Sequence, residues 1–335
     1  MNGWIIGFVM AIASNTPVPI PNGWTLAKYL NKGDYVFSRE GTPIQIVSTH
    51  EYMPMDCYEV LLNDGVSVVV DSHARFPVSD INKRWVENRY QGKRKRTAKQ
   101  NYASPEELLE KGLTNQRGDR IFSITNAQPI QFVWEDHPVP PFIVGMWMTK
   151  RNIRGRFILR PENIEYIQKK IRSFGWNWVK EGSNLLEIRP SINHAFITKY
   201  PTVPKILPPE YSFGSIEQRI ELLQGLLAIR PNCFNKKRKD FEVYSRDLRF
   251  LITIQGICES LGMKTQVFHS NTSITHKLRF KTNIPLVPWQ EFEPNLKNAT
   301  RRMITAVKSA QIMSCIHIDT AQPFVVGQGF LPIWH

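Results

Sequence analysis

The stretch Ser215-Ile-Glu-Gln-Arg-Ile-Glu-Leu-Leu-Gln-Gly-Leu-Leu227 decides how the central part of this chain should fold. Ser215 and Gln218 stand three residues apart, which is the spacing of a capping box at a helix N-terminus. Behind this pair, apolar residues recur at helical spacing and share one face. They are Ile216, Ile220, Leu223 and Leu227. The stretch therefore predicts an amphipathic helix that begins at a defined residue and buries one side.

The same order of predicted elements, helix, strand and helix, occurs twice around this stretch. In the first half we expect them over 140–148, 153–160 and 161–174. In the second half we expect them over 215–227, 241–245 and 247–261, followed by a strand over 273–281. Gly175 and Gly262 stand where the later helix of each half should end. This order predicts an internal repeat.

Short segments of alternating polarity flank the repeat on both sides. The predicted strands are 35–37, 44–47, 58–62, 66–70, 312–318 and 324–326. Asn63-Asp64-Gly65 is a hairpin turn signal between two of them. Thr16 to Gly23 carries three prolines and is expected to be a loop, and Ser104-Pro105 should begin a short helix. We therefore expect an α+β protein in which a sheet-rich domain is interrupted by the repeat.

Positive charge points to a polyanionic partner. Lys and Arg total 43 against 29 Asp and Glu, which gives a formal net charge of +14. Such an excess favours DNA or RNA over an anionic membrane. The strand over 273–281 would turn Ile274, His276, Leu278 and Phe280 to one side and Thr275, Lys277, Arg279 and Lys281 to the other. A cationic sheet face suits a DNA groove, although an ordinary solvated face gives the same pattern.

Other basic residues are candidates for the same contact, including the run over 92–99, which is equally consistent with a solvated loop. The candidate DNA-binding residues are Lys93, Arg94, Lys95, Arg96, Lys150, Arg151, Arg154, Arg156, Arg230, Lys236, Lys237, Arg238, Lys277, Arg279 and Lys281.

The cysteines and the N-terminal segment limit the other functions. The four cysteines are Cys57, Cys233, Cys258 and Cys315. They stand far apart in sequence without a CxxC pair, so we expect reduced thiols in a bacterial cytoplasm and no zinc site. Residues 1–10 are apolar but too short to span a bilayer, and they lack the basic residues of a signal peptide. We expect no metal, no cofactor and no membrane partner.

Several stretches, in this order, resemble a known arrangement. They are Ala11-Ile-Ala-Ser-Asn-Thr-Pro-Val-Pro-Ile-Pro-Asn-Gly-Trp24, Leu30-Asn-Lys-Gly-Asp-Tyr-Val-Phe37, Phe142-Ile-Val-Gly-Met-Trp-Met-Thr-Lys150, Ser215 to Leu227, Cys315-Ile-His-Ile-Asp319 and Phe324-Val-Val-Gly-Gln-Gly-Phe-Leu-Pro332. The chain resembles an intein of the kind found in phage terminase large subunits. Such an intein has an all-β Hint splicing domain interrupted by a pseudo-symmetric LAGLIDADG homing endonuclease domain with an αββαββα repeat. The resemblance implies an apolar segment over 1–10, a Hint-like domain over 11–136 and 296–335, and a LAGLIDADG-like domain over 138–295.

The splicing positions depart from the family's pattern. Ala11 stands where the family normally has a Cys nucleophile that attacks the preceding peptide bond. Trp334 and His335 stand where the family ends in His-Asn, and neither can cyclise as the Asn does. The chain also stops there, so we expect no downstream extein. His73 matches the catalytic histidine, but Val70 replaces its Thr partner, and we favour a structural role for it. We therefore expect no splicing, unless the alanine was engineered.

The nuclease positions depart in the same way. In the family, an acid ends each LAGLIDADG helix, and the two acids hold Mg²⁺ between the scissile phosphates. Lys150 and Arg230 take these positions, and such cations repel Mg²⁺ and suit phosphate oxygens. Gly145 and Gly225 are kept, so the two helices can still pack closely. The resemblance thus implies a degenerate, non-cutting double-stranded DNA-binding protein, a phage or mobile-element regulator that blocks or represses a site as a pseudo-twofold monomer.

Three alternatives stay open on the sequence. An active homing endonuclease would have to recruit acids such as Glu135, Asp240 or Glu242, none of which lies at a motif position. A scaffold or virion protein would use the old fold for protein contacts. A splicing precursor mutated by design would regain splicing when Cys replaces Ala11 and His-Asn is restored at the end.

Overall fold

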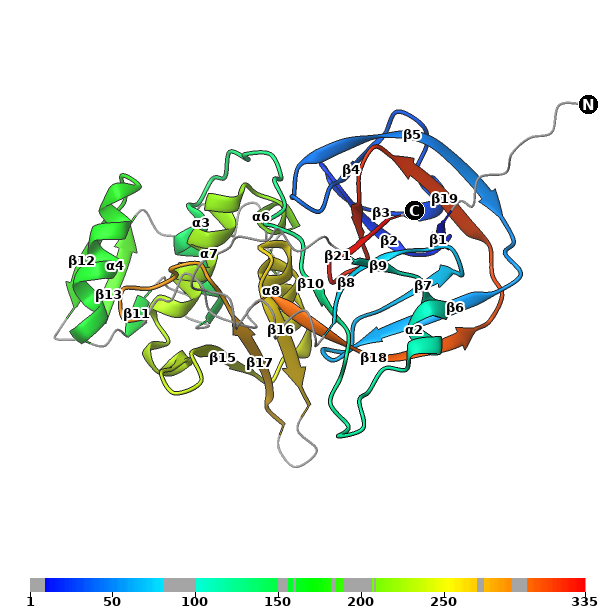
Figure 1. Cartoon of the computed structure of the whole chain (residues 1–335). Helices are drawn as coiled ribbons and strands as arrows, with labels where there is room; N and C mark the ends of the chain where they lie inside the picture. The colour runs from blue at the N-terminus through cyan, green and yellow to red at the C-terminus, as the bar shows by residue number, and fades with distance from the viewer. Residues whose placement is uncertain are drawn as a thin grey trace, which may run out of the picture. The chain divides into compact units, whose positions relative to one another are not determined.

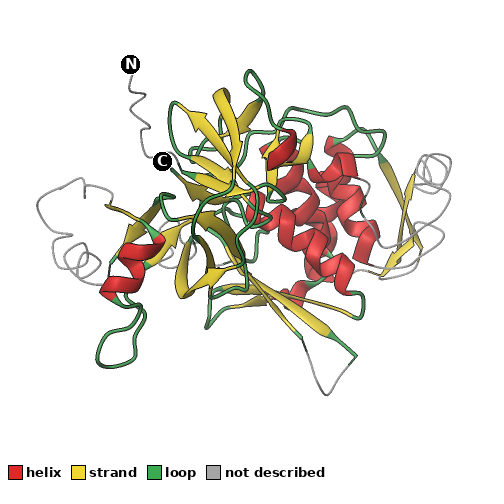
Figure 2. Cartoon of the chain, turned by 90° about the vertical axis from the view of Figure 1, so that its right-hand side faces the viewer, coloured by secondary structure: helices red, strands yellow, loops and turns green. Residues whose placement is uncertain are grey.

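The computed structural model describes residues 10–80, 101–149, 156–158, 161–181, 185–189, 207, 209–269, 274–290 and 300–334. The chain divides into two compact units (Figure 1). Unit 1 comprises Met1–Gln131 and Thr300–His335, and unit 2 comprises Phe132–Ala299. Most of the described helices belong to unit 2, whereas unit 1 is built mainly of strands (Figure 2). None of the described helices is long and apolar enough to cross a membrane.

Unit 1 is organised around a ten-stranded sheet with the order β4-β5-β19-β1-β7-β6-β18-β10-β8-β9, in which every pairing is antiparallel. Its strands are β1 (Ala11–Ala13), β4 (Tyr35–Phe37), β5 (Pro43–Tyr52), β6 (Cys57–Leu62), β7 (Ser67–Asp71), β8 (Phe76–Ser79), β9 (Asn101–Ala103), β10 (Ser123–Thr125), β18 (Arg301–Ala310) and β19 (Cys315–Thr320). Strands from both ends of the chain alternate in this sheet, because β19 pairs with β1 and β18 pairs with β6.

The smaller elements of unit 1 are two hairpins and two short helices. They are β2 (Pro17–Ile20) with β3 (Gly23–Leu26), β20 (Phe324–Val326) with β21 (Leu331–Ile333), η1 (Ala27–Tyr29) and α2 (Pro105–Lys111). The turn predicted at Asn63-Asp64-Gly65 is confirmed, since Gly65 has φ +90° and Leu62 N donates to Val66 O at 2.8 Å. The helix predicted at Ser104 is also confirmed, with the Ser104 hydroxyl accepting from Glu107 N.

Two predictions for unit 1 are wrong. The segment expected to be a loop contains β2, which pairs only with β3; prolines are tolerated in such a small, two-stranded edge arrangement. The strand expected over 312–318 begins at Cys315, and Ile312 is exposed outside it.

Unit 2 contains the predicted repeat. Its elements are α3 (Pro141–Thr149), β11 (Arg156–Ile158), α4 (Pro161–Ser173), β12 (Asn177–Glu181), β13 (Leu185–Arg189), α6 (Pro209–Ser212), α7 (Ile216–Ala228), η2 (Pro231–Cys233), β14 (Phe234–Asn235), β15 (Asp240–Ser245), α8 (Leu248–Ser260), β16 (Lys264–Phe268) and β17 (His276–Lys281). The sheets are β11-β13-β12 and β14-β15-β17-β16. In the first sheet, β13 lies between β11 and β12, the strands on either side of α4 in the sequence. In the second sheet, β17 lies in the same way between β15 and β16, the strands on either side of α8. A twofold axis relating the halves stays a prediction.

The helix that opens the second half forms as its sequence predicts. Ser215 Oγ accepts from Gln218 N at 3.3 Å, and Gln218 Oε1 accepts from Ser215 N at 2.9 Å, so the capping box is complete. The buried face differs from the expected stripe. Ile216 and Ile220 are only partly buried, whereas four leucines are fully buried: Leu222, Leu223, Leu226 and Leu227.

Helices α3 and α7 pack backbone against backbone at two glycines. A Cβ added to Gly225 would lie 1.8 Å from Phe142 O, and one added to Gly145 would lie 2.0 Å from Leu222 O. Real side chains do not tolerate such distances, so only glycine fits at either position. The close helix contact predicted from Gly145 and Gly225 is therefore confirmed.

Candidate functional site

The end of α7 carries a cation where the resemblance places a catalytic acid. Arg230 follows the last turn, and its N donates to Leu227 O at 2.9 Å. Its Nη1 donates to Tyr244 O on β15 at 3.0 Å, and burial lowers the pKa of its guanidinium. The buried side chain of Asn163 donates to Ala228 O at 2.8 Å, which satisfies one of the carbonyls at the end of α7. Lys150, its counterpart after α3, lies outside the described residues, as do Lys93, Arg94, Lys95, Arg96, Arg151, Arg154 and His335.

The sheet β14-β15-β17-β16 has one apolar and one polar face. Leu278 and Phe280 of β17 are buried, together with Phe241 and Val243 of β15. Alternation turns the basic residues of β17 to the opposite face, as predicted. Ile274 does not belong to the apolar side, because it precedes the strand and is 76% exposed. We call the opposite side the polar face; it comprises Arg238, Asp240, Glu242, Tyr244, Lys264, Gln266, Phe268, Lys277, Arg279 and Lys281.

Three of the five basic residues of the polar face contact two carboxylates. Glu242 Oε1 lies 2.8 Å from Arg238 Nη2, 3.3 Å from Lys277 Nζ and 3.2 Å from Arg279 Nη2. Asp240 Oδ2 lies 3.2 Å from Arg238 Nε and 3.6 Å from Arg279 Nε. The face predicted to be cationic from β17 therefore also carries two acids, which β15 contributes. Burial alone would raise the pKa of Glu242, but hydrogen bonds from Tyr244, Lys277 and Arg279 outweigh it and keep that pKa below its ordinary value.

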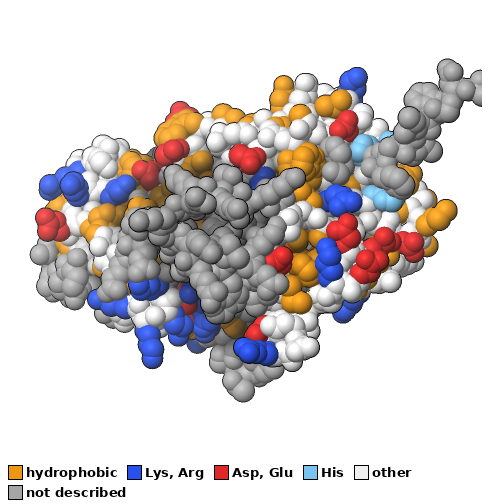
Figure 3. Space-filling view, viewed as in Figure 1, with side chains coloured by type: hydrophobic (Ala, Val, Ile, Leu, Met, Phe, Trp, Pro, Cys, Tyr) orange, Lys and Arg blue, Asp and Glu red, His pale blue; other side chains and the backbone are white. Residues whose placement is uncertain are grey.

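Aromatic side chains complete the polar face. Two cations lie over the ring of Phe268. The centre of the ring is 4.8 Å from Lys277 Nζ and 4.7 Å from the guanidinium carbon of Arg279. Tyr244 is half exposed and donates through its hydroxyl to Glu242 at 2.9 Å. The face thus holds five cations against two carboxylates and keeps a positive balance. In Figure 3, Lys and Arg side chains gather at the lower left, the region in which Figure 1 draws β15 and β17. The exposed Lys236 and Lys237 lie in the turn before β15.

The acids weighed for a nuclease do not form a metal site in the described part of the chain. Asp240 and Glu242 already contact two and three cations, respectively, which compete with any divalent ion for their oxygens. Glu135 is exposed, and its backbone N and O bond the side chain of Gln218. Among the residues that the structure describes, no group of three His, Cys, Asp or Glu side chains is placed to hold a metal ion.

A second cluster of reactive groups surrounds the start of β1 in unit 1. Ala11 is fully buried and packs with Cys57 and Cys315. Burial raises the pKa of the Cys315 thiol to about 12, and the neighbouring Cys57 adds to this rise. His317 Nδ1 lies 2.8 Å from Met10 O, the carbonyl of the peptide bond that precedes Ala11.

This cluster was missed from sequence because its members are remote along the chain. Ala11 itself has no nucleophilic atom, as expected, yet sulfur nucleophiles lie against it. The expectation of no splicing rests on Ala11, on Val70 beside His73 and on Trp334 and His335. It leaves these two thiols out of account, and it stays a prediction. Cys57 begins β6 and Cys315 begins β19, so only the assembled sheet brings them to one place.

The remaining splicing positions lie near the end of β7. Tyr52 donates to Asp71 Oδ2 at 2.5 Å, and Asp71 Oδ1 accepts from His73 N and Ala74 N. The His73 side chain is exposed at this turn. Burial and the hydrogen bond to Asp71 raise the pKa of Tyr52. The backbone of Trp334 pairs with Arg75 through two hydrogen bonds of 2.8 Å.

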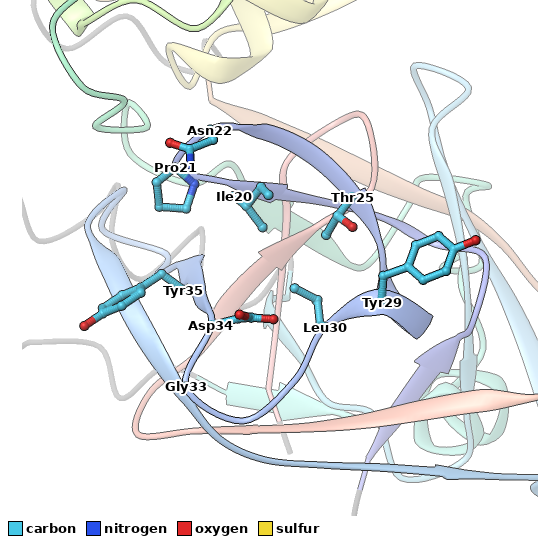
Figure 4. A pocket seen from close by; sticks show the side chains of 9 residues that line it. All are labelled: Ile20, Pro21, Asn22, Thr25, Tyr29, Leu30, Gly33, Asp34 and Tyr35. Atoms are coloured by element: carbon cyan, nitrogen blue, oxygen red, sulfur yellow. The ribbon is translucent and has the colours of Figure 1, made fainter.

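A pocket of about 400 Å³ in unit 1 offers less chemistry (Figure 4). Asp34 and Leu30 lie near its centre, with Tyr35 and Tyr29 on opposite sides. Asp34 Oδ2 accepts from Asn31 N at 2.8 Å in a local turn. No histidine, cysteine, lysine or arginine is among the residues that line it, which are Ile20, Pro21, Asn22, Thr25, Tyr29, Leu30, Gly33, Asp34 and Tyr35.

Comparison with known proteins finds partial similarity to two replicative helicases and to parts of several solved structures. No family model matches the sequence. The replicative DNA helicase DnaB of Mycobacterium intracellulare is 25% identical over 291 residues, which are 82% of this chain and 48% of that protein. The chain thus spans about half the length of this relative. The corresponding helicase of Mycobacterium leprae (strain TN) is 34% identical over 74 residues, 22% of this chain and 12% of that protein.

The solved structures with similar parts include both kinds of protein. The MchDnaB-1 intein covers 21% of this chain and 54% of its own length at 34% identity, with a TM-score of 0.20. The homing endonuclease I-DmoI in complex with DNA and Mn covers 43% of this chain and 89% of its own length at 12% identity, with a TM-score of 0.30. None of the proteins named here is a terminase.

Proposed function

We propose that unit 2 binds double-stranded DNA through the polar face of β14-β15-β17-β16 and does not cut it. In this proposal unit 2 is a LAGLIDADG-like domain and unit 1 a Hint-like domain. The observation that carries the proposal is the ordered positive surface formed by Lys277 and Arg279 on a sheet whose other face is buried. A sheet of this kind can lie along a groove and contact both phosphates and base edges.

The carboxylates of the polar face support specific contact rather than diffuse attraction. Glu242 holds three basic side chains in fixed positions, so less conformational entropy is lost when they meet DNA. Glu242 is itself an acceptor that suits an exocyclic amine of a base, and Arg279 suits guanine. We therefore propose that these residues discriminate among sequences, whereas Lys236 and Lys237 contact phosphates.

The absence of cutting is proposed from the charge at the end of α7. Arg230 replaces the acid that the resemblance requires, and a guanidinium cannot ligate Mg²⁺. In this proposal Arg230 would face phosphates instead of metal. A bound but uncut site would then be blocked to other proteins, which is the regulatory role we propose for a phage or mobile element. The resemblance to terminase inteins specifically gains no support from the relatives named above.

Selection of duplexes from a random library tests the proposal. The full-length chain should retain a subset of duplexes, and binding measured by fluorescence anisotropy should weaken steeply with salt. Incubation of the selected duplex with Mg²⁺ or Mn²⁺ should leave it intact. Double-strand cleavage would refute the non-cutting part, and no duplex binding at low salt would refute the whole proposal.

Two variants locate the interface. Lys277→Ala with Arg279→Ala should lower the slope of log affinity against log salt by up to about 2 and relax sequence preference. Lys169→Ala, which removes an exposed lysine on α4, is the matched control and should leave affinity nearly unchanged. Equal effects of both changes would show that binding depends on net charge and not on the polar face.

A second function is favoured by the cluster around Ala11. We propose that unit 1 can transfer the acyl group of Met10 from Ala11 to the thiol of Cys315. The Cys315 sulfur would form a thioester with the Met10 carbonyl carbon while the Met10–Ala11 C–N bond breaks. The thiol proton would pass to the nitrogen of Ala11, so no other reactant is needed. The packing of Cys315 against Ala11 supports this step.

Release of a fused protein tests this second function. A folded carrier protein joined before Met1 should be released slowly by dithiothreitol or hydroxylamine, which cleave thioesters. Cys315→Ala should abolish release at the Met10–Ala11 bond. Release that persists in Cys315→Ala would refute the role of this thiol.

A further inference from the structure

A buried histidine lies within hydrogen-bond distance of the carbonyl of the peptide bond before Ala11. His317 Nδ1 lies 2.8 Å from Met10 O, and only 9% of His317 is exposed. The register of the sheet sets this contact, since His317 is the cross-strand partner of Ala11 in the β1–β19 pair. The imidazole is therefore aimed at this one carbonyl by the sheet itself.

The contact fixes which histidine nitrogen carries a proton. A peptide carbonyl oxygen can only accept a hydrogen bond, so Nδ1 must be the donor. A donor at this distance draws electron density from the carbonyl group and makes the carbonyl carbon more electrophilic toward a thiol. The same N–H stabilises a negative oxygen more strongly than a neutral one, which is the requirement for catalysis of acyl transfer.

We propose that His317 is a catalytic residue of unit 1, the oxyanion donor for acyl transfer from the Met10–Ala11 bond to Cys315. The inference rests on the second function above. Cys315 stands two residues before His317 on β19, so both side chains lie on the same face of the sheet as Ala11, the cross-strand partner of His317. The thiol supplies the nucleophile, and Nδ1–H holds the oxygen that becomes negative when the sulfur adds to the carbon.

A purely structural histidine would satisfy the Met10 carbonyl without affecting the reaction, because buried carbonyls normally have a partner. The two roles differ in their response to conservative replacement. Asparagine at position 317 carries an amide N–H near the place of Nδ1 and can keep the donor. Leucine keeps the approximate volume and removes it. If His317 is a catalytic donor, the asparagine variant should release carrier much faster than the leucine variant. If His317 has only a structural role, the replacements should change folding and leave the rate of release from folded protein unchanged.

The test uses the full chain with a folded carrier protein fused before Met1, and it follows carrier release by dithiothreitol. His317→Leu should slow release by about 10²–10³-fold, and His317→Asn should recover most of the rate. The matched control is His50→Leu, because His50 is the exposed cross-strand neighbour of His317 on β5. That variant should release carrier at the wild-type rate.

The outcomes separate the two claims. If the unsubstituted chain releases no carrier, the second function falls, and the role of His317 falls with it. If it releases carrier and His317→Leu does so at the same rate, only the role of His317 is overturned. Loss of release in both His317→Leu and His317→Asn, with circular dichroism unchanged, would also overturn the donor assignment. Slow release in the leucine variant alone supports it.

Discussion

Replacing Gly225 by alanine should separate α3 from α7 and destabilise unit 2. A Cβ at this position would lie 1.8 Å from Phe142 O and 2.7 Å from Phe142 C. Both obstacles are backbone atoms, so no side-chain rotation relieves them. One helix would have to move by about 1 Å or more against a close-packed core.

The expected magnitude follows from two opposing effects. Alanine is favoured over glycine in a helix interior by about 1 kcal/mol. Overpacking of a well-filled core costs about 1–3 kcal/mol, and a rigid backbone contact lies at or beyond the upper end. The net loss of unfolding free energy should therefore be about 2 kcal/mol or more.

Hydrogen exchange of the full chain measures this loss of unfolding free energy in the two helices concerned, through peptides that cover 141–149 and 216–228. Gly256→Ala is the matched control, because Gly256 lies inside α8 with no atom within 4 Å of an added Cβ. That change should be neutral or slightly stabilising. If Gly225→Ala alters protection no more than Gly256→Ala does, the account of the helix contact is wrong.

Three further outcomes are expected. Glu242→Gln should strengthen binding of unselected duplexes at low salt several-fold, because it removes a negative charge from the polar face, and it should reduce the preference for the selected duplex, because it weakens the ion pairs that hold three basic side chains; anisotropy titration with both duplexes checks this, and an unchanged preference would contradict it. Asn163→Leu should lower stability by about 1–3 kcal/mol by leaving Ala228 O unpaired, as urea unfolding would measure; an unchanged midpoint would argue against the hydrogen bond. Carrier release through Cys315 should rise about tenfold per pH unit from pH 6 to 9, because the raised pKa leaves the thiol mostly protonated. Cys57→Ala should shift that profile to lower pH, and a flat profile would exclude the thiolate as nucleophile.

Local features of the fold could be predicted because they depend on neighbouring residues. The capping box at Ser215 and the end of α8 before Gly262, whose φ is +74°, follow from side-chain and backbone preferences within a few positions. Gly145 and Gly225 could be interpreted because a resemblance supplied their partner helices. The prolines of β2 were misleading, since their tolerance depends on an edge position that local sequence does not reveal.

The chemistry of both sites depends on strand register, which single-sequence patterns do not give. Glu242 meets Arg279 because β15 and β17 pair in a register that sets these residues opposite each other. His317 meets the Met10–Ala11 bond because β19 returns from the far end of the chain to pair with β1. Alternation along one strand predicts which side a residue faces, but not which residue faces it from the next strand.

Hydrogen exchange of the full chain with and without a selected duplex tests the DNA-binding account most directly. Peptides covering 240–245 and 276–281 should become protected when the duplex is added, and the recovered DNA should be intact in the presence of Mg²⁺. Unchanged exchange in both peptides while the duplex is bound elsewhere, or a cut duplex, would contradict the account.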